Sequence, residues 1–188
     1  MTALLLLALL AANDFTRVEE KDGVLLEARE VPGSSFVEYR VTAVTTGDAS
    51  ELCTKAWGTG EMDRDEPHLA ARTLLSEKSD ERLTWDRIEA PLISPRDIIV
   101  RRTRTWLGGG GCRVEFHADP TAGPPVKSGT VRIVVLNGSF TFTPLGGGKV
   151  RVEHRVHTEP GGLIAPFVVE PARREAAVAW VKRLVRGK

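Results

Sequence analysis

The chain has 188 residues, and its 26 Lys or Arg residues almost balance its 25 Asp or Glu residues, which gives a net charge of +1. This balance excludes a strongly basic surface that tracks phosphates, so no nucleic-acid partner is expected. With 41% hydrophobic and 27% charged residues, the composition is that of a globular protein, and the length suits one compact monomeric domain.

The first twelve residues carry an apolar run, ALLLLALLAA, that is about half the ~20 residues a membrane-spanning helix needs. It matches the apolar segment of a secretory signal, with Ala11 and Ala12 as small residues at a cleavage point, although no Lys or Arg precedes it. We therefore expect residues 1–12 to be a signal peptide, residues 13–188 to be a single domain, and the protein to be exported. The alternative is an uncleaved first helix on a cytoplasmic protein.

The segment after the apolar run predicts a short helix over 14–20, a turn at Asp22-Gly23, and a hairpin of strands 24–31 and 36–45. The pattern then changes to a helical period. Asp48 is a candidate N-cap, with Glu51 completing a capping box. The apolar residues that follow recur at helical spacing and are Ala49, Leu52, Cys53, Ala56 and Trp57.

The second half of the chain reads as antiparallel strands. Asn137-Gly138 is a strong hairpin dipeptide, but we favour a bulge in one long strand because Gly146–Gly148 already supplies a turn. The loop 119–129 is long enough to have a functional or mobile role. The predicted strands are 69–77, 82–89, 98–106, 112–118, 131–143 and 150–158.

The last segment, 164–186, is predicted to be one long helix with a broad apolar stripe. The stripe consists of Ile164, Phe167, Val168, Ala176, Ala177, Trp180, Val181 and Leu184. Such a face must be covered, and the economical arrangement is a curved antiparallel sheet wrapped around that helix. The fold class is therefore α+β, of the helix-grip type.

Metal and thiol chemistry are not indicated. Cys53 and Cys112 match neither a zinc-site spacing nor a redox CxxC motif, and no two histidines have metal-ligand spacing, so no metal and no cofactor are expected. A disulfide between the two cysteines is conceivable. His68, His117 and His157 are expected at the surface.

Three short segments resemble START domains, the lipid-transfer family related to the steroidogenic acute regulatory protein, and they occur in that family's order. They are Asp22–Ser34 (containing DGV and REVPGS), Ala90–Asp97 (APLISPRD) and His157–Pro166 (HTEPGGLIAP). The resemblance implies the helix-grip fold of the SRPBCC superfamily. It also implies a tunnel between the sheet and the last helix that binds, and in a carrier transfers, a lipid or other hydrophobic small molecule.

The sequence also departs from the START pattern. Phe140 and Phe167 stand where the family often has tryptophan, which keeps an aromatic ring at both positions. Arg102 matches the arginine of a buried charge pair in some sterol-binding members, but Leu83 stands at the matching acidic position. The resemblance therefore does not extend to sterol specificity.

Two polar residues fall on apolar strand faces. Arg102 shares a face with Ile98 and Val100, and His154 shares one with Val150 and Val152. Arg102 is either in a structural ion pair, with Glu115, Glu89 or Asp86 as partner, or in contact with a ligand. His154 is either a neutral hydrogen-bonded histidine of the interior or part of the site.

Binding of a lipid or other apolar molecule is the leading hypothesis, with transient contact to a membrane surface and no enzymatic activity. The expected lining residues are Arg102, Val114, Phe116, Val135, Val152, His154, Phe167, Val168, Ala172 and Trp180. The alternative is a cyclase- or hydratase-like enzyme of the same fold, in which Arg102 and His154 converge on a polar pocket and His154 acts as general acid or base. Arg96-Asp97 is no catalytic dyad, because neighbours on a strand point to opposite faces, and it is expected to fix the preceding loop.

Overall fold

A computed structural model describes residues 14–58, 68–90 and 93–186. The predicted signal peptide and the connection at 59–67 lie outside the described residues. Within the described ranges, no helix combines the length and the apolar character needed to cross a membrane.

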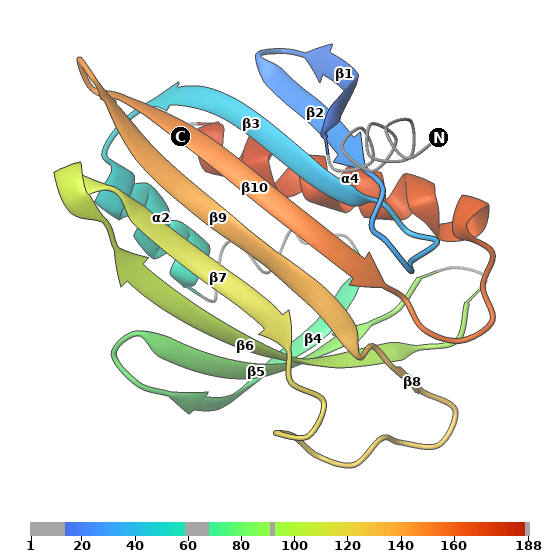
Figure 1. The fold of residues 1–188 in the computed structure, drawn as a ribbon. Coiled ribbons are helices and arrows are strands. Elements are labelled where there is room, and N and C mark those ends of the chain that lie inside the picture. Colours follow the sequence, from blue (N-terminus) through green and yellow to red (C-terminus); the bar gives the residue numbers. More distant parts are fainter. Residues whose placement is uncertain (1–13, 59–67, 91–92, 187–188) are drawn as a thin grey trace, which may run out of the picture.

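The molecule is built on one curved sheet that wraps around a long C-terminal helix (Figure 1). The strand order is β1-β2-β3-β10-β9-β7-β6-β5-β4, and every pair is antiparallel except the short β8, which runs parallel to β6. The elements are β1 (Thr16–Lys21), β2 (Val24–Arg29), β3 (Glu38–Thr46), α2 (Ala49–Trp57), β4 (Leu69–Glu77), β5 (Glu81–Ile88), β6 (Arg96–Trp106), η1 (Gly108–Gly110), β7 (Cys112–Ala118), β8 (Val131–Arg132), β9 (Val135–Gly146), β10 (Lys149–Glu159) and α4 (Pro166–Val185). The predicted α+β fold, a curved antiparallel sheet around a C-terminal helix, is confirmed.

Helix α2 forms where the capping signal predicts it. The Asp48 side chain accepts hydrogen bonds from the backbone N–H groups of Ser50 and Glu51, which satisfies two donors that the first turn leaves unpaired. The apolar face of α2 is buried against β7 and β9, and a disulfide joins Cys53 on the helix to Cys112 on β7. The disulfide therefore ties α2 covalently to the sheet at the first residue of β7.

Helix α4 packs on β3 and β10, and only its second half follows the predicted stripe. Ala177, Val181 and Leu184 are buried in the main core. In the first turn, Val169 is buried, whereas Phe167 and Val168 are exposed. The predicted stripe was therefore wrong in the first turn, because a continuous stripe was extended through the prolines that begin the helix.

The segment predicted as a helix over 14–20 is strand β1, so that prediction was wrong. Asp22 and Gly23 both have positive φ (54° and 74°) and form the two-residue turn of a β1–β2 hairpin. All six residues of β1 are exposed at the edge of the sheet. The strand therefore lacks the apolar alternation by which it would be recognised.

Strand β9 runs through Asn137-Gly138 as predicted, but without the expected bulge. Its register with β7 and with β10 is unbroken at Gly138, which pairs with Phe116 and Val156. A Cβ at Gly138 would lie 2.3 Å from the Phe116 ring and 2.4 Å from the carbonyl oxygen of Arg155. Glycine is required here so that the Phe116 ring can lie across the strand.

The loop 119–129 covers the outer face of β6. The backbone N–H of Asp119 donates to the carbonyl of Ile99, and Arg132 donates to the carbonyls of Pro120 and Pro124. Gly123 lies directly against the Ile99 side chain. Because Ile98 and Val100 face the other side of the sheet, this loop lies away from the concave interior.

Candidate functional site

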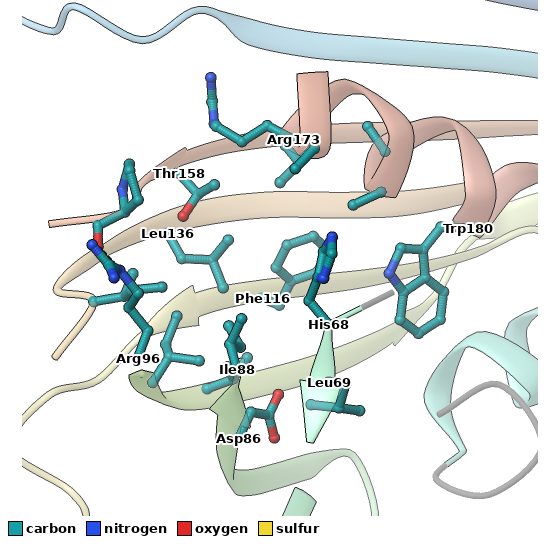
Figure 2. A pocket seen from close by; sticks show the side chains of 18 of the residues that line it. His68, Leu69, Asp86, Ile88, Arg96, Phe116, Leu136, Thr158, Arg173 and Trp180 are labelled. Carbon is teal, nitrogen blue, oxygen red and sulfur yellow. Dashed lines mark hydrogen bonds between the residues drawn. The ribbon is translucent and has the colours of Figure 1, made fainter. Parts of the chain in front are cut away.

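A pocket of about 250 Å³ lies between α4 and the concave face of the sheet (Figure 2). This volume is close to the lower end of the range of small-molecule pockets, about 300–1,000 Å³. Most of its lining is apolar, from Leu69, Ile88, Ile93, Ile98, Val100, Val114, Phe116, Ile133, Leu136, Phe140, Val156, Val169 and Trp180, among others. The helix contributes small side chains, Ala172, Ala176 and Ala177, which leave the space open.

Six of the ten expected lining residues lie around this pocket. They are Arg102, Val114, Phe116, His154, Ala172 and Trp180. The other four lie elsewhere, so the structure does not bring the full predicted set together.

The four displaced residues have identifiable reasons. Val152 is fully buried but packs in the main core between the sheet and the helices. Phe167 is 79% exposed and Val168 is 46% exposed, because the first turn of α4 turns them outward. On β9, Leu136 lines the pocket in place of Val135 because the predicted bulge, which would have reversed the alternation, is absent.

The pocket also has polar residues that were not expected there. Alternation along β5 places Thr84, Asp86 and Ile88 on one face, and this signal could have assigned Asp86 and Ile88 to the lining. Alternation along β6 likewise places Arg96 on the face of Ile98, Val100 and Arg102. Other additions come from β3, β4 and the loops, and only the curvature of the sheet brings them to the pocket. They include Tyr39, His68, Leu69, Arg72 and Pro160.

Asp86 is the centre of a charged cluster in the pocket wall. Arg72 donates two hydrogen bonds to its carboxylate, at 2.7 and 2.6 Å. Nη2 of Arg102 lies 3.8 Å from the same carboxylate, and Nη1 of Arg102 donates to Thr84 at 2.9 Å. Arg102 therefore has an ion pair with one of its three expected partners, and it also faces the pocket.

His154 is buried beneath α4. Its Nδ1 lies 3.1 Å from the carbonyl oxygen of Ala177, and its ring stacks on Phe140 with centroids 4.2 Å apart. Burial lowers the pKa of His154 to about 4. The ring is neutral near pH 7, so Nδ1–H donates to Ala177.

Of the three histidines expected at the surface, one is exposed, one is half-buried and one is buried. His117 is exposed, and His68 is half-buried at the pocket. His157 is 8% exposed, so its prediction was wrong. Its ring lies on the outer face of β10, where Nδ1 is 3.5 Å from the carbonyl oxygen of Val37.

Arg96 and Asp97 face opposite sides of β6, as the strand period predicts. Asp97 forms a two-bond ion pair with Arg132 and accepts a hydrogen bond from the Trp85 indole. Despite its burial, these partners hold the pKa of the Asp97 carboxyl below its usual value. Arg96 faces the pocket and donates to the carbonyl of Ser94, which fixes the loop before β6 as expected.

These features define a helix-grip protein whose last helix closes one side of a mainly apolar pocket. The structure is similar to a STAR-related lipid transfer protein from Xanthomonas axonopodis, with a TM-score of 0.80 at 25% identity over 91% of this chain and 96% of that one. It is also similar to the human StarD13 (DLC2) lipid transfer and protein localization domain, with a TM-score of 0.77 at 17% identity over 100% and 96% of the two chains.

A further similar structure is human StAR-related lipid transfer protein 5, with a TM-score of 0.77 at 19% identity over 98% of this chain and 94% of that one. The chain therefore has the fold of these START-related lipid transfer structures, the family that the three sequence segments resemble. No family model matches the sequence, and no curated protein matches it.

Proposed function

We propose that this START-like domain binds a lipid or another apolar small molecule in the pocket beneath α4. The observation that carries this proposal is the pocket itself, with its largely apolar lining and the three alanines that α4 presents to it. Transfer of an acyl chain from water to such a lining stabilises the complex by about 0.8 kcal/mol per methylene group. The similar solved structures are named as lipid transfer proteins or domains, which supports the same class of ligand.

We further propose that the protein exchanges its ligand with a lipid bilayer. Leu163 is fully exposed, and Phe167 and Val168 in the first turn of α4 are exposed as well. The same segment of chain contributes Pro160 and Val169 to the pocket lining. Exposed apolar side chains on a segment that also lines the pocket suit contact with the acyl region of a membrane, through which a ligand would leave or arrive.

Export is proposed from two features. One is the apolar run at the amino terminus. The other is the disulfide between Cys53 and Cys112, because disulfides persist mainly in oxidising compartments.

We propose binding without catalysis. In the enzyme alternative His154 would act as acid or base. Here Nδ1 of His154 is engaged by Ala177, and burial makes the protonated ring unfavourable near neutral pH.

The test is to identify what the pocket contains. Protein produced in a cell would be purified, extracted with organic solvent and analysed by mass spectrometry. We expect one apolar ligand class at a stoichiometry near one per chain. Repeated recovery of empty protein that binds no fatty acid, sterol or phospholipid would overturn the proposal.

A further inference from the structure

Arg96 is a buried arginine whose charge is not paired with a carboxylate of the described residues, unlike that of Arg82. Among the described residues, Arg82 and Arg96 are the two arginines buried as whole residues, at 8% and 4% exposed. Arg82 pairs with Glu77. Within 14–58, 68–90 and 93–186, Arg96 has no carboxylate at ion-pair distance, and its hydrogen bonds go to main-chain carbonyls.

Those carbonyls belong to two separate loops. Nη1 of Arg96 donates to Ser94, and Nε donates to Pro160 at 3.4 Å. Neutral acceptors satisfy the N–H groups but leave the positive charge uncompensated in a desolvated place. Burial accordingly lowers the pKa of the Arg96 guanidinium, which nevertheless stays protonated at any physiological pH.

One nitrogen of Arg96 is left for a further partner. Nη2 makes no hydrogen bond within the described part of the chain, and it is not one of the buried unsatisfied side-chain atoms there, so it keeps accessible surface. Arg96 lines the pocket together with Ile93, Thr158 and Pro160. Figure 2 shows Arg96 and Thr158 among the lining residues. The neighbouring Gly162 leaves room, since a Cβ there would lie 3.8 Å from Nη2.

The surroundings do not supply the missing negative charge. Asp97, the next residue, faces the other side of the sheet and is committed to Arg132. Asp86 is committed to Arg72 and Arg102. The same lining includes the neutral hydroxyl of Thr158 and the apolar residues Ile93, Ile133 and Leu136.

We propose that Arg96 binds the anionic end group of the ligand, a carboxylate or a phosphate monoester, while the apolar chain extends through the pocket toward Trp180. This inference rests on the proposed lipid-binding function and specifies its ligand class as an anionic amphiphile. A guanidinium binds both end groups through charge-assisted hydrogen bonds, which are stronger than those to a neutral hydroxyl.

The first experiment compares end groups on one alkyl chain. Binding of dodecanoic acid, dodecyl phosphate and dodecanol to the full chain would be measured by calorimetry at pH 7.5. We expect the acid or the phosphate to bind at least about tenfold more tightly than the alcohol. Whichever anion binds more tightly identifies the end group, and acetate and inorganic phosphate are expected not to bind because they lack the chain.

Two sets of variants assign this preference to Arg96. Arg96→Gln is expected to bind the acid no better than the alcohol, whereas Arg87→Gln, a change at an exposed arginine on the adjacent strand, keeps the preference. Gly162→Glu leaves Arg96 in place and puts a carboxylate beside Nη2, so it is expected to abolish the preference. Gly162→Gln has the same size and the same backbone strain but no charge, so it should retain the preference. This pair tests the role of Arg96 even if Arg96→Gln fails to fold.

The outcomes separate this inference from the proposed function. If none of the three dodecyl compounds binds, the inference is overturned, and the proposed function also fails if the protein is recovered empty and binds neither sterol nor phospholipid. If all three bind equally, or if Gly162→Glu and Gly162→Gln behave alike, the ligand is bound without Arg96 and the inference is overturned. Binding of inorganic phosphate as tight as that of dodecyl phosphate would also overturn it, because the site would then be one for a free anion.

Discussion

At the scale of single residues, His154 makes stability depend on pH. A histidine in an unfolded chain has a pKa near 6.5, whereas burial lowers the pKa of folded His154 to about 4. As pH falls, the unfolded state therefore takes up the proton first. The contribution of His154 is complete above about pH 6.5 and is lost as pH falls toward 4, by about 3 kcal/mol in all.

Unfolding by urea at a series of pH values between 4.5 and 7.5 would measure this loss. His154→Asn is the matched variant, because its side-chain amide can still donate to Ala177 but does not titrate in this range. We expect the free energy of unfolding of the variant to fall less steeply with decreasing pH than that of the wild type. Equal slopes would show that His154 does not titrate as its burial requires.

Gly138 provides a second prediction at this scale. Alanine at this position would bring its Cβ against the Phe116 ring and against the backbone of Arg155, which cannot move without breaking the ladder. We expect Gly138→Ala to lower the free energy of unfolding by about 1–3 kcal/mol, as overpacking does. Gly108→Ala is the control, since nothing lies within 4 Å of its added Cβ. If Gly138→Ala left the free energy of unfolding unchanged, β9 would have to bend at this point to accommodate the added methyl group.

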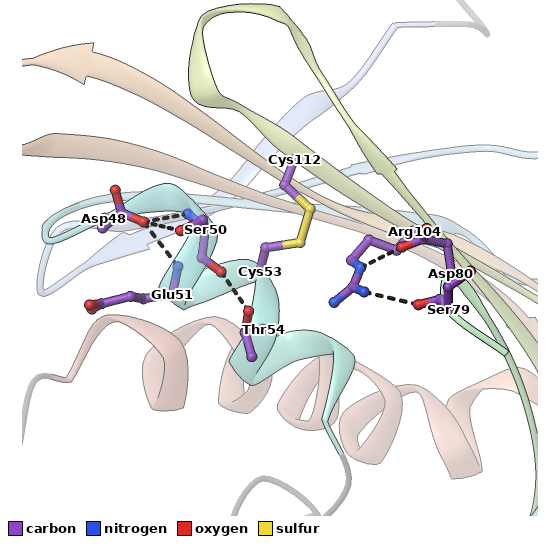
Figure 3. The surroundings of a disulfide bond; sticks show 9 residues. All are labelled: Asp48, Ser50, Glu51, Cys53, Thr54, Ser79, Asp80, Arg104 and Cys112. Atoms are coloured by element: carbon purple, nitrogen blue, oxygen red, sulfur yellow. Dashed lines mark hydrogen bonds and ion pairs between the residues drawn. A yellow bond between two sulfur atoms is a disulfide. The ribbon is translucent and has the colours of Figure 1, made fainter. Parts of the chain in front are cut away.

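At the scale of elements, the disulfide links α2 to β7 across 59 residues of sequence, as Figure 3 shows. Closing a loop of this length in the unfolded chain contributes about 4 kcal/mol by chain entropy. The double variant Cys53→Ala, Cys112→Ala is expected to lose a large part of this stability in urea unfolding. Wild-type protein treated with a reductant should unfold at a similarly lowered urea concentration, and an unchanged midpoint in both would contradict the stabilising role.

The elements that sequence could predict are those with local signals. Helix α2 has a capping aspartate and an apolar face at helical spacing, and the strands beyond it alternate or are separated by glycine turns. Strand β1 has neither signal, because an edge strand exposed on both faces gains its stability from pairing with β2. The turn at Asp22-Gly23 was the local sign that a hairpin could begin there.

At the scale of the molecule, the pocket was predictable in kind but not in full membership. His154 and Arg102 were assigned to the inward face by strand alternation, and both line the pocket. Arg96 and Pro160 meet at the pocket although 64 residues separate them, and no periodicity in either segment predicts that contact. A single absent bulge in β9 was enough to exchange Val135 for Leu136.

The exposed apolar residues Leu163, Phe167 and Val168 lead to the last prediction, which concerns exchange with membranes. Leu163→Asp combined with Phe167→Asp places two charges where contact with the acyl region is proposed, and burying a charge there is unfavourable. Transfer of a fluorescent fatty acid between phospholipid vesicles should slow by about tenfold, an effect of about 1.4 kcal/mol.

Equilibrium affinity for the same fatty acid should be unchanged, because neither side chain lines the pocket. The control is Leu145→Asp, at an exposed leucine (43%) near the end of β9, beside the start of β10 and away from α4's first turn, and it should transfer at the wild-type rate. An undiminished rate in the double variant, or an equal loss in the control, would place membrane contact elsewhere on the molecule. Loss of affinity together with rate would instead mean that the first turn of α4 moves inward when the ligand is bound.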